Sequence, residues 1–401
     1  MSVLVQDWSG ASLVAEGVQG AHGGMRAEVW SDLGAVEAIW RKLESGPDCL
    51  GTPYQRFDWV AAFLRKGAAA GPLRVVVLRD ASGWPRLLMP LAIRRERGVR
   101  VARVVGGTHA NYHLPLFASR EATAIRHEDL VDLLVRVAPK AGIDLYLLTH
   151  QPRTWDGAVN PLAIGARPGA NDAYGLMLGP DSEATLRRAF SADARKKLRS
   201  KEKRLIEAVG PLDYRRAETR AEMDSYLGAF FAHKAARFAS LCIADPYADE
   251  SIRSFLAAAA DPGAGTPAIE IHALVARETG RVLATFGGAV DCGRFSGMMT
   301  AFDGAADVSR FSPGDLLLHH LVRDQAERGR RAFDLGVGKA RYKSSICDET
   351  IELAEFVLPV SARGRLYGVA AGAATRLRAR IKRDPRLWAL AQRLRRLRPA
   401  T

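Results

Sequence analysis

The sequence predicts an α/β (α+β) protein built from two domains of similar design. Its 401 residues exceed the usual size of one domain, and a composition of 48% hydrophobic and 25% charged residues is typical of a folded globular protein. Strand and helix signals follow the same order in both halves: a strand, helices, three adjacent strands, a helix and a further strand. Three consecutive strands differ from the βαβ alternation of a dinucleotide-binding fold. We therefore expect a mixed, mostly antiparallel sheet flanked by helices in each half.

The first domain is expected over residues 25–165. Residues 1–24, rich in Gly and Ser, are expected to be flexible. Helical patterns run over Leu33 to Leu43, Phe57 to Arg65 and Glu121 to Lys140. Strand signals stand in "MRAEVW", "LRVVVLRD", "RLLMPLAIRRE", "VRVARVVGG" and "IDLYLLTH".

The second domain is expected over residues 176–361, after the Pro-, Gly- and Asn-rich span "NPLAIGARPGANDAYG". It opens with a basic helix over Arg187 to Leu205, which is either a solvated face or an electropositive edge near an anionic substrate. Further helices are expected over Arg220 to Arg237, Asp249 to Ala259 and Pro313 to Arg328. The strand signals are "LDYRRA", "AIEIHALVAR", "RVLATFGGAVDC", "RFSGMMTAFD", "AFDLGV" and "IELAEFVLPV".

Positive charge is concentrated at the end of the chain. The formal net charge is +14, and the residues from Ser361 onwards contain twelve Arg or Lys against one acid, Asp384. Pro385 divides this basic tail, residues 362–401, into two helical pieces, and the second has an apolar stripe of Leu387, Leu390, Ala391, Leu394 and Leu397 with Trp388 near its edge. Docking on the protein's own surface, contact with an anionic membrane and contact with RNA all remain open.

Four widely spaced cysteines make a disulfide framework or a zinc site improbable, and a reducing compartment is the simpler interpretation. The start of the chain lacks a signal-peptide pattern, and no run of about 20 apolar residues occurs. We expect a cytoplasmic protein, with possible peripheral contact at the inner membrane surface. His109 and His113 lie in a Gly- and Asn-rich loop without a nearby carboxylate, so no metal is expected there.

The stretch "FDLGVGKARYKSSICDE" resembles a phosphate loop at first sight. A P-loop requires G-x-x-x-x-G-K-[ST], but Phe333 stands where the first glycine is needed and Ala340 follows Lys339. The dinucleotide fingerprint requires a third glycine where Arg341 stands. Neither nucleotide-binding rule is met.

A better anion site lies upstream, where a polar loop enters a helix at Ser312-Pro313-Gly314. Serine can cap the helix, proline suits the first turn and glycine admits a close backbone approach. A helix N-terminus of this kind binds phosphate without needing a lysine. A simple structural serine cap is the alternative.

The block "AFDGAADVSRFSPGDLLLHHLVRDQAERGRRAFDLGVGKARYKSSIC" resembles the signature region of GNAT-superfamily acyltransferases. Within it, the strand ending "AFD", the "SPG" helix start, Gly329, "FDLGVG" and "YK" occur in the family's order. The branch it resembles contains the CelD-like proteins of cellulose biosynthesis, and the layout is similar to FemAB-type aminoacyltransferases. The resemblance implies tandem GNAT-like domains, with acetyl-CoA or another acyl-CoA held at Ser312, Pro313 and Gly314.

Acyl transfer from a thioester to an amine or hydroxyl needs a base, oxyanion stabilisation and often an acid for the departing thiolate. Asp334, Tyr342 and Lys343 are the first candidates, with Asp303 behind them. Asp334 would orient or deprotonate the acceptor, Tyr342 would protonate the leaving sulfur, and Lys343 would hold a phosphate or carboxylate. The alternative is a structural Asp334–Lys343 pair with Tyr342 in the core.

The acceptor, a small molecule or a saccharide, is expected in the groove between the domains. "VVGGTHANYHLPL" resembles a first-domain segment of the family, with Asn111 at the usual aspartate and Tyr112 after it. His233 and Arg237 lie on a helix whose counterpart faces this groove. Transfer from aminoacyl-tRNA and a non-catalytic role in a polysaccharide machine at the membrane surface remain the alternatives; a nucleic-acid partner is unlikely because no aromatic-rich RNA-binding signature is present.

Overall fold

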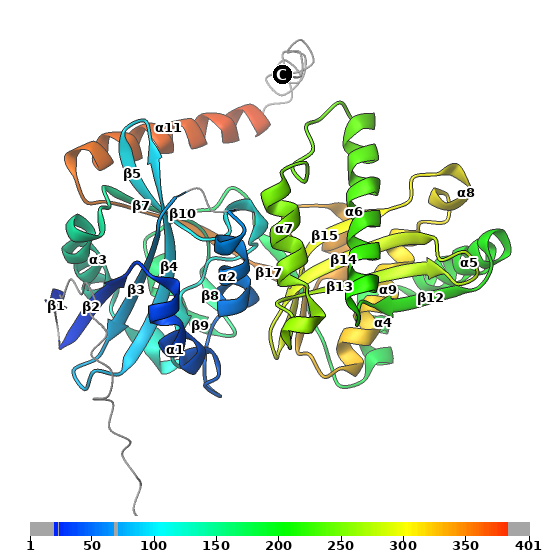
Figure 1. The fold of residues 1–401 in the computed structure, drawn as a ribbon, viewed down its shortest axis with the longest axis horizontal. Helices are drawn as coiled ribbons and strands as arrows, with labels where there is room; N and C mark the ends of the chain where they lie inside the picture. The colour runs from blue at the N-terminus through cyan, green and yellow to red at the C-terminus, as the bar shows by residue number, and fades with distance from the viewer. Residues whose placement is uncertain (1–19, 23, 68–70, 384–401) are drawn as a thin grey trace, which may run out of the picture.

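The computed structural model describes residues 20–22, 24–67 and 71–383. Two lobes lie side by side, each with a sheet and flanking helices (Figure 1). A long helix, α11 (Ala362–Arg383), crosses back over the first lobe. Among the described helices, none has the length and apolar character needed to cross a membrane.

The first sheet has nine strands in the order β1-β2-β3-β4-β5-β7-β18-β10, with β6 paired to β4. Among the pairs described, only β5 and β7 run in parallel. Its strands are β1 (Gly20–His22), β2 (Met25–Trp30), β3 (Leu73–Arg79), β4 (Pro85–Glu96), β5 (Val99–Val104), β6 (Leu116–Phe117), β7 (Leu145–Pro152), β10 (Arg167–Pro168) and β18 (Leu353–Pro359). Its helices are α1 (Leu33–Glu44), α2 (Phe57–Arg65) and α3 (His127–Ala141), and a small hairpin joins β8 (Thr154–Trp155) to β9 (Ala158–Val159).

The second sheet has seven strands in the order β12-β13-β14-β15-β16-β11-β17. Here too one parallel pair, β15 with β16, stands among the antiparallel pairs that the structure describes. The strands are β11 (Ala173–Met177), β12 (Leu212–Arg216), β13 (Ile269–Ala276), β14 (Val282–Val290), β15 (Arg294–Phe302), β16 (Ala332–Val337) and β17 (Glu349–Ile351). The helices are α4 (Ser182–Ala189), α5 (Ala192–Val209), α6 (Arg220–Ser240), α7 (Glu250–Ala259), α8 (Ala306–Ser309), α9 (Pro313–Glu327) and α10 (Arg341–Ile346).

The two lobes repeat one plan. In the first, β3, β4 and β5 form an antiparallel run, and α3 then leads to β7 on the parallel side of β5. In the second, β13, β14 and β15 are followed by α9 and by β16 in the same way. The predicted fold class, two mixed and mostly antiparallel sheets flanked by helices, is confirmed.

Local differences from the expected elements have physical causes. The segment "IELAEFVLPV" is two strands, and β18 pairs with β7 in the first sheet, because Leu353 and Phe356 are buried in the first core. The basic helix is broken between α4 and α5, where Ser191 caps α5 by accepting from the N–H of Ala194. The helix expected from Glu121 begins at His127, after a short 3₁₀ turn. Within the stretch 1–24, Gly20–His22 forms a short strand that pairs with β2.

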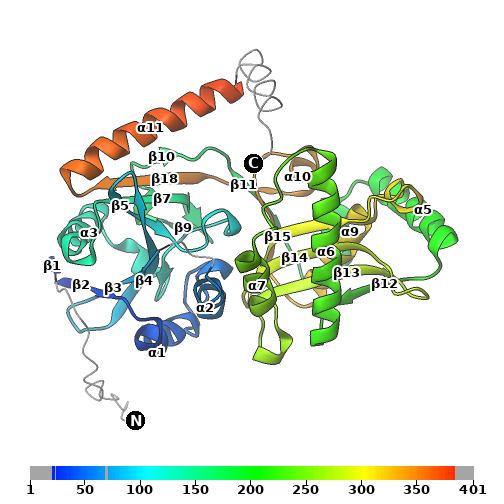
Figure 2. The ribbon, with the colours of Figure 1, turned by 45° about the horizontal axis from the view of Figure 1, so that its top comes forward.

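The first piece of the basic tail packs on the protein's own surface. Helix α11 lies against β5, β7 and β18 of the first sheet (Figure 2). Gly364 and Gly368 are buried on its inner face, and Gly364 allows a close approach to the sheet, because a Cβ there would overlap the Asp144 carbonyl oxygen. The apolar stripe from Leu387 to Leu397 lies outside the described residues.

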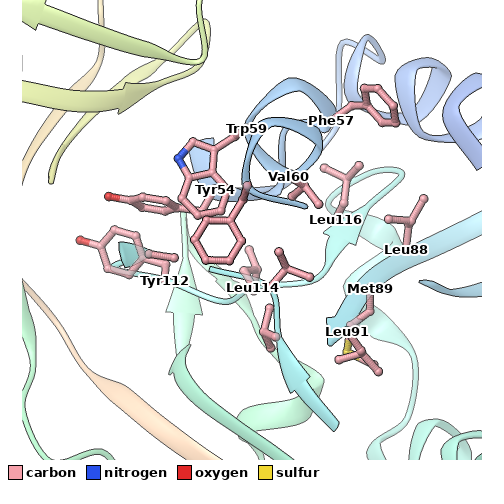
Figure 3. Packing of buried hydrophobic residues seen from close by; sticks show 14 of the residues in the cluster. Tyr54, Phe57, Trp59, Val60, Leu88, Met89, Leu91, Tyr112, Leu114 and Leu116 are labelled. Carbon is pink, nitrogen blue, oxygen red and sulfur yellow. The ribbon is translucent and has the colours of Figure 1, made fainter. Parts of the chain in front are cut away.

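An apolar core runs through both lobes. Trp59 of α2 stacks on Phe63 with ring centroids 5.4 Å apart, and its edge meets Phe255 of α7 at 5.1 Å. Beside them, the hydroxyls of Tyr54 and Tyr112 point the same way, out of the aromatic cluster (Figure 3). The Tyr54 hydroxyl reaches the second lobe, where it bonds the Ser296 hydroxyl at 3.0 Å. The shared core therefore fixes polar groups from both lobes at one place.

Candidate functional site

Strands β15 and β16 separate next to the start of α9. They pair over only three positions, from Arg294 with Ala332 to Ser296 with Asp334. Beyond this point β15 continues along β14 and β16 continues along β11, and the β14–β15 register shifts opposite Gly287 and Gly288. Parting strands leave backbone N–H and C=O groups without ladder partners, and bulges commonly occur next to active sites. The gap, here called the β15–β16 wedge, can accept an extended group.

Asn111 from the first lobe closes the base of this wedge. Its Nδ2 donates to the Tyr54 hydroxyl at 2.7 Å and to the Gly297 carbonyl at 2.9 Å. On the other side stands Gly336, with φ of 76°, where a Cβ would lie 2.8 Å from Asn111 Oδ1. Glycine is needed at this position for both reasons. The structure thus places Asn111 between the two separating strands.

The start of α9 has no side-chain cap. Ser312 adopts a left-handed conformation, with φ of 54°, and its hydroxyl accepts a hydrogen bond from Lys201 Nζ at 2.7 Å. The alternative of a structural serine cap is therefore wrong. An uncapped helix start next to a lysine favours a bound anion, although Asp315 in the first turn offsets part of this potential. The basic helix α5 thus supplies a cation at the predicted anion site.

A cavity of about 750 Å³ lies between α6, the end of β15 and the start of α9. Five of the predicted site residues line it: His233, Arg237, Asp303, Gly314 and Tyr342. Its volume falls in the range of small-molecule sites. The structure therefore brings together residues that are more than 100 positions apart in the sequence.

Two groups in this cavity suit proton transfer. Burial lowers the pKa of His233, against the opposing effect of Asp303, so the imidazole is neutral near pH 7. Its Nδ1 is buried and has no hydrogen-bond partner among the described residues. Tyr342 is 46% exposed, which excludes the alternative of a core position, and partial burial raises the pKa of its hydroxyl. The cavity therefore contains a neutral base and a protonated acid.

Asp303 and Lys343 make structural contacts. Asp303 accepts from Arg281 Nε at 2.8 Å and from the N–H of Ala305 at 2.9 Å. Lys343 Nζ donates to the carbonyls of Gly336 and Val337, both at 3.1 Å, and burial lowers its pKa. The alternative of a structural Asp334–Lys343 pair is therefore wrong. Lys343 stabilises the turn after β16 through these two hydrogen bonds and does not line the cavity.

Asp334 forms a buried ion pair with Arg294 inside the second lobe, and Arg294 in turn contacts the first lobe. It is fully buried, and its Oδ1 accepts from Arg294 Nη1 at 2.6 Å. Arg294 also donates to Asp156 at 3.2 Å and lies over the Trp155 ring at 4.2 Å, and both of these residues come from the first lobe. Burial raises the pKa of Asp334, and the Arg294 guanidinium opposes that rise. Arg294 thus links Asp334 at the base of the wedge to the first lobe, and Asp334 lies outside the cavity lining.

Sequence reasoning missed the neighbours of Asp334. A Cβ on Gly175 would lie 2.9 Å from Glu349 Oε2 and 3.1 Å from Asp334 Oδ1, so the two carboxylates approach each other over this glycine. Asp334 Oδ2, Glu349 Oε2 and the Tyr112 hydroxyl are buried without hydrogen-bond partners in the described part of the chain. Burial also raises the pKa of Glu349. No local signal marks this cluster, because β11, β16 and β17 bring it together.

Within the described residues, no group of three or more His, Cys, Asp or Glu side chains is placed to hold a metal ion. A parallel strand pair that separates beside an uncapped helix start is the arrangement expected of an acyl-transferring GNAT-like domain. The second lobe of this chain has this arrangement.

The comparisons agree with this class. Residues 192–344, which include β15, α9, β16 and the cavity residues, match the family model described as "Acetyltransferase (GNAT) domain". A search of curated proteins finds no match.

Two solved structures share the fold over most of the chain. FemX aligns with a TM-score of 0.58 and 11% identity, covering 85% of this chain and 99% of FemX. A conserved protein of unknown function from Bacteroides thetaiotaomicron VPI-5482 aligns with a TM-score of 0.52 and 11% identity, covering 82% of this chain and 99% of that one. At this identity the likeness concerns the fold alone.

Proposed function

We propose that this protein is an acyl-CoA-dependent N- or O-acyltransferase in which an amine or hydroxyl acceptor attacks the thioester directly. The observation that carries the proposal is the β15–β16 wedge, which opens beside the uncapped start of α9 and next to Lys201. The wedge offers backbone groups to an extended arm, and the helix start offers N–H groups to a pyrophosphate.

The residues at the helix start fit the donor. Pro313 occupies the first turn without needing an N–H partner, and Gly314 faces the cavity, where a Cβ would make only ordinary contact with Phe302 at 3.5 Å. Lys201 lies close enough to the helix start to add a charge-assisted hydrogen bond to a phosphate oxygen. Ser312, Pro313 and Gly314 therefore remain the proposed donor-binding residues, and Lys201 joins them.

In the proposed reaction, the acceptor nitrogen or oxygen forms a bond to the acyl carbon while its proton passes to His233. The C–S bond then breaks, and Tyr342 gives its proton to the thiolate. Backbone N–H groups of β15 beyond Ser296, which have left the β16 ladder, hydrogen-bond the developing oxyanion. Arg237, in the same cavity, is placed to contact the acceptor.

Isothermal titration with acetyl-CoA and longer acyl-CoAs tests the proposal. Saturable binding by the folded protein is expected, and its absence would overturn the proposed function. Thiol release with a panel of amines, amino sugars and polysaccharide fragments then tests the acceptor class.

The proton acceptor has its own test. Because burial lowers the pKa of His233, the rate is expected to rise through a limb below pH 6.5, the ordinary imidazole value. His233→Gln should remove this limb and keep acyl-CoA binding. An unchanged pH profile in His233→Gln would assign the base to another group.

We place the protein in the CelD-like branch, acting on polysaccharide or envelope precursors in the cytoplasm or at the inner membrane surface. Asn111 and Tyr112 support an acceptor site at the lobe interface, since Asn111 lies at the wedge base and the Tyr112 hydroxyl is buried without a partner among the described residues. Asp334 stays a candidate for orienting the acceptor through this cluster.

Two other candidate functions differ from this one in the ligands that the protein should bind. The FemX-like fold and the basic helix α5 favour an aminoacyl-tRNA donor as the second candidate. Salt-dependent tRNA binding without acyl-CoA binding would support it. A non-catalytic accessory of polysaccharide synthesis would bind vesicles but neither donor.

A further inference from the structure

Helix α11 has two unlike faces. Its inner face packs on the first sheet, where Gly364 and Gly368 are buried and the Tyr367 hydroxyl bonds Glu96. Its outer face carries Leu366, 76% exposed, and Val369, 67% exposed. Of the large hydrophobic side chains that the structure describes, these two are the most exposed.

The exposed apolar surface extends along the outer face of the helix. Ala370 and Ala373 are exposed beside Leu366 and Val369, at spacings that keep all four on one side of a helix. The sequence then has Leu377 and Ile381 at the same spacing. An apolar stripe on the solvent side of a docked helix requires a partner, because exposed contiguous apolar surface marks an interaction site.

The charge of the helix identifies the partner. From Ala362 to Arg383 the sequence contains seven Arg or Lys and no acid. Arg363 and Arg365 are exposed on either side of Leu366. An apolar stripe flanked by cations is the pattern of helices that lie in the surface of an anionic membrane. Two copies of this helix would repel each other, and the described outer face lacks the aromatic side chains on which single-stranded RNA stacks.

We infer that the outer face of α11 is a docking surface for an anionic lipid bilayer. The sheet beneath holds the helix in place, so docking needs no folding of the described part of α11. Leu366 and Val369 insert below the headgroups, while the flanking arginines contact lipid phosphates. This surface lies on the first lobe, away from the β15–β16 wedge, so its test is independent of acyl transfer.

Co-sedimentation of the full chain with vesicles tests the inference. The vesicles contain either equal parts of phosphatidylglycerol and phosphatidylcholine or phosphatidylcholine alone. Binding is expected only to the first kind, and it should weaken as salt rises. The double variant Leu366→Glu/Val369→Glu should lower the partition coefficient at least about tenfold, since each side chain loses its burial and adds a repelled charge.

The matched control is Val159→Glu/Ile243→Glu. These two side chains are 54% and 56% exposed and lie in β9 and in the loop between α6 and α7, so the control makes the same charge change elsewhere. It should reduce binding much less than the α11 variant. Equal reductions would mean that net charge alone drives binding, and would overturn the inference.

Three further outcomes decide the occupant of the surface. Absence of binding to phosphatidylglycerol vesicles overturns the inference. If truncation after Arg383 abolishes binding while Leu366→Glu/Val369→Glu leaves it intact, residues 384–401 are the contact and α11 is not. Tighter binding to RNA than to vesicles, with the same sensitivity to the α11 variant, would replace lipid by nucleic acid.

Discussion

Replacing Arg294 with methionine tests how much the buried Arg294–Asp334 pair, which links β15 to β16, contributes to the stability of the fold. The guanidinium is 6% exposed and its bond to Asp334 Oδ1 is 2.6 Å long, while Asp334 is fully buried. Methionine keeps much of the packing on Trp155 but leaves a buried carboxylate without its cation. Breaking a buried ion pair in this way costs about 3–5 kcal/mol, a large part of a typical stability of about 5–15 kcal/mol.

The cost should depend on pH. Burial already raises the pKa of Asp334 and Arg294 opposes the rise, so the variant's Asp334 should have a still higher pKa. A carboxyl whose pKa is raised by folding contributes stability that is present below its unfolded pKa of about 3.9 and is lost as the pH rises through the folded pKa. Arg294→Met should therefore be least destabilising in acid and most destabilising near pH 7.

Urea unfolding at several pH values measures this effect. The double variant Arg294→Met/Asp334→Leu is the control: with both charges removed, it should be more stable than Arg294→Met near neutral pH. A loss below about 1 kcal/mol for Arg294→Met would refute the argument, since that is the value of an exposed pair. A loss that does not change with pH would refute it as well.

Two further changes test other parts of the fold. His113 is 3% exposed, and burial lowers its pKa to about 3 in the folded protein, below the ordinary value of about 6.5 that applies in the unfolded chain. As the pH falls from 7 to 5, the unfolded chain binds a proton at this position and the folded protein does not, so the free energy of unfolding should fall by about 2 kcal/mol. Urea titrations of His113→Gln should not show this pH dependence. Gly175→Ala should destabilise by about 1–3 kcal/mol, because its Cβ would press on Glu349 and Asp334, and should lower the melting temperature. The matched control is Gly228→Ala, a helical position where no atom lies within 4 Å of a new Cβ. This change should stabilise the protein by about 0.5–1 kcal/mol. Equal effects of the two glycine substitutions on stability would contradict this explanation.

Those parts of the site that depend on residues adjacent in the sequence could be predicted from it. The Ser312-Pro313-Gly314 helix start can be recognised from the order of residue types, and α9 begins at Pro313 as expected. The alternating strands and helices predicted both sheets. The absence of a side-chain cap at Ser312 was not predictable, because the lysine that donates to its hydroxyl comes from α5, 111 residues earlier.

Long-range pairings explain the remaining misses. Arg294 has no motif around it, and its partners Asp334 and Asp156 are 40 and 138 positions away. Strand β18 crosses to the first sheet because its buried residues complete the first core, a choice that alternation alone does not encode. The sequence predicts that Lys343 holds a phosphate or carboxylate, but its hydrogen bonds go to backbone carbonyls, which residue order does not reveal.

The central claim, an acyl-CoA donor held at the start of α9, is tested most directly by acetyl-CoA binding to Lys201→Ala and Lys203→Ala. Both changes remove one charge from the same helix, but only Lys201 donates to Ser312, while Lys203 is exposed. A charge-assisted hydrogen bond contributes about 1.5–3 kcal/mol, so Lys201→Ala should weaken binding at least about tenfold and Lys203→Ala should leave it nearly unchanged. Equal affinities for the two variants, or no acetyl-CoA binding by the folded wild-type protein, would contradict it.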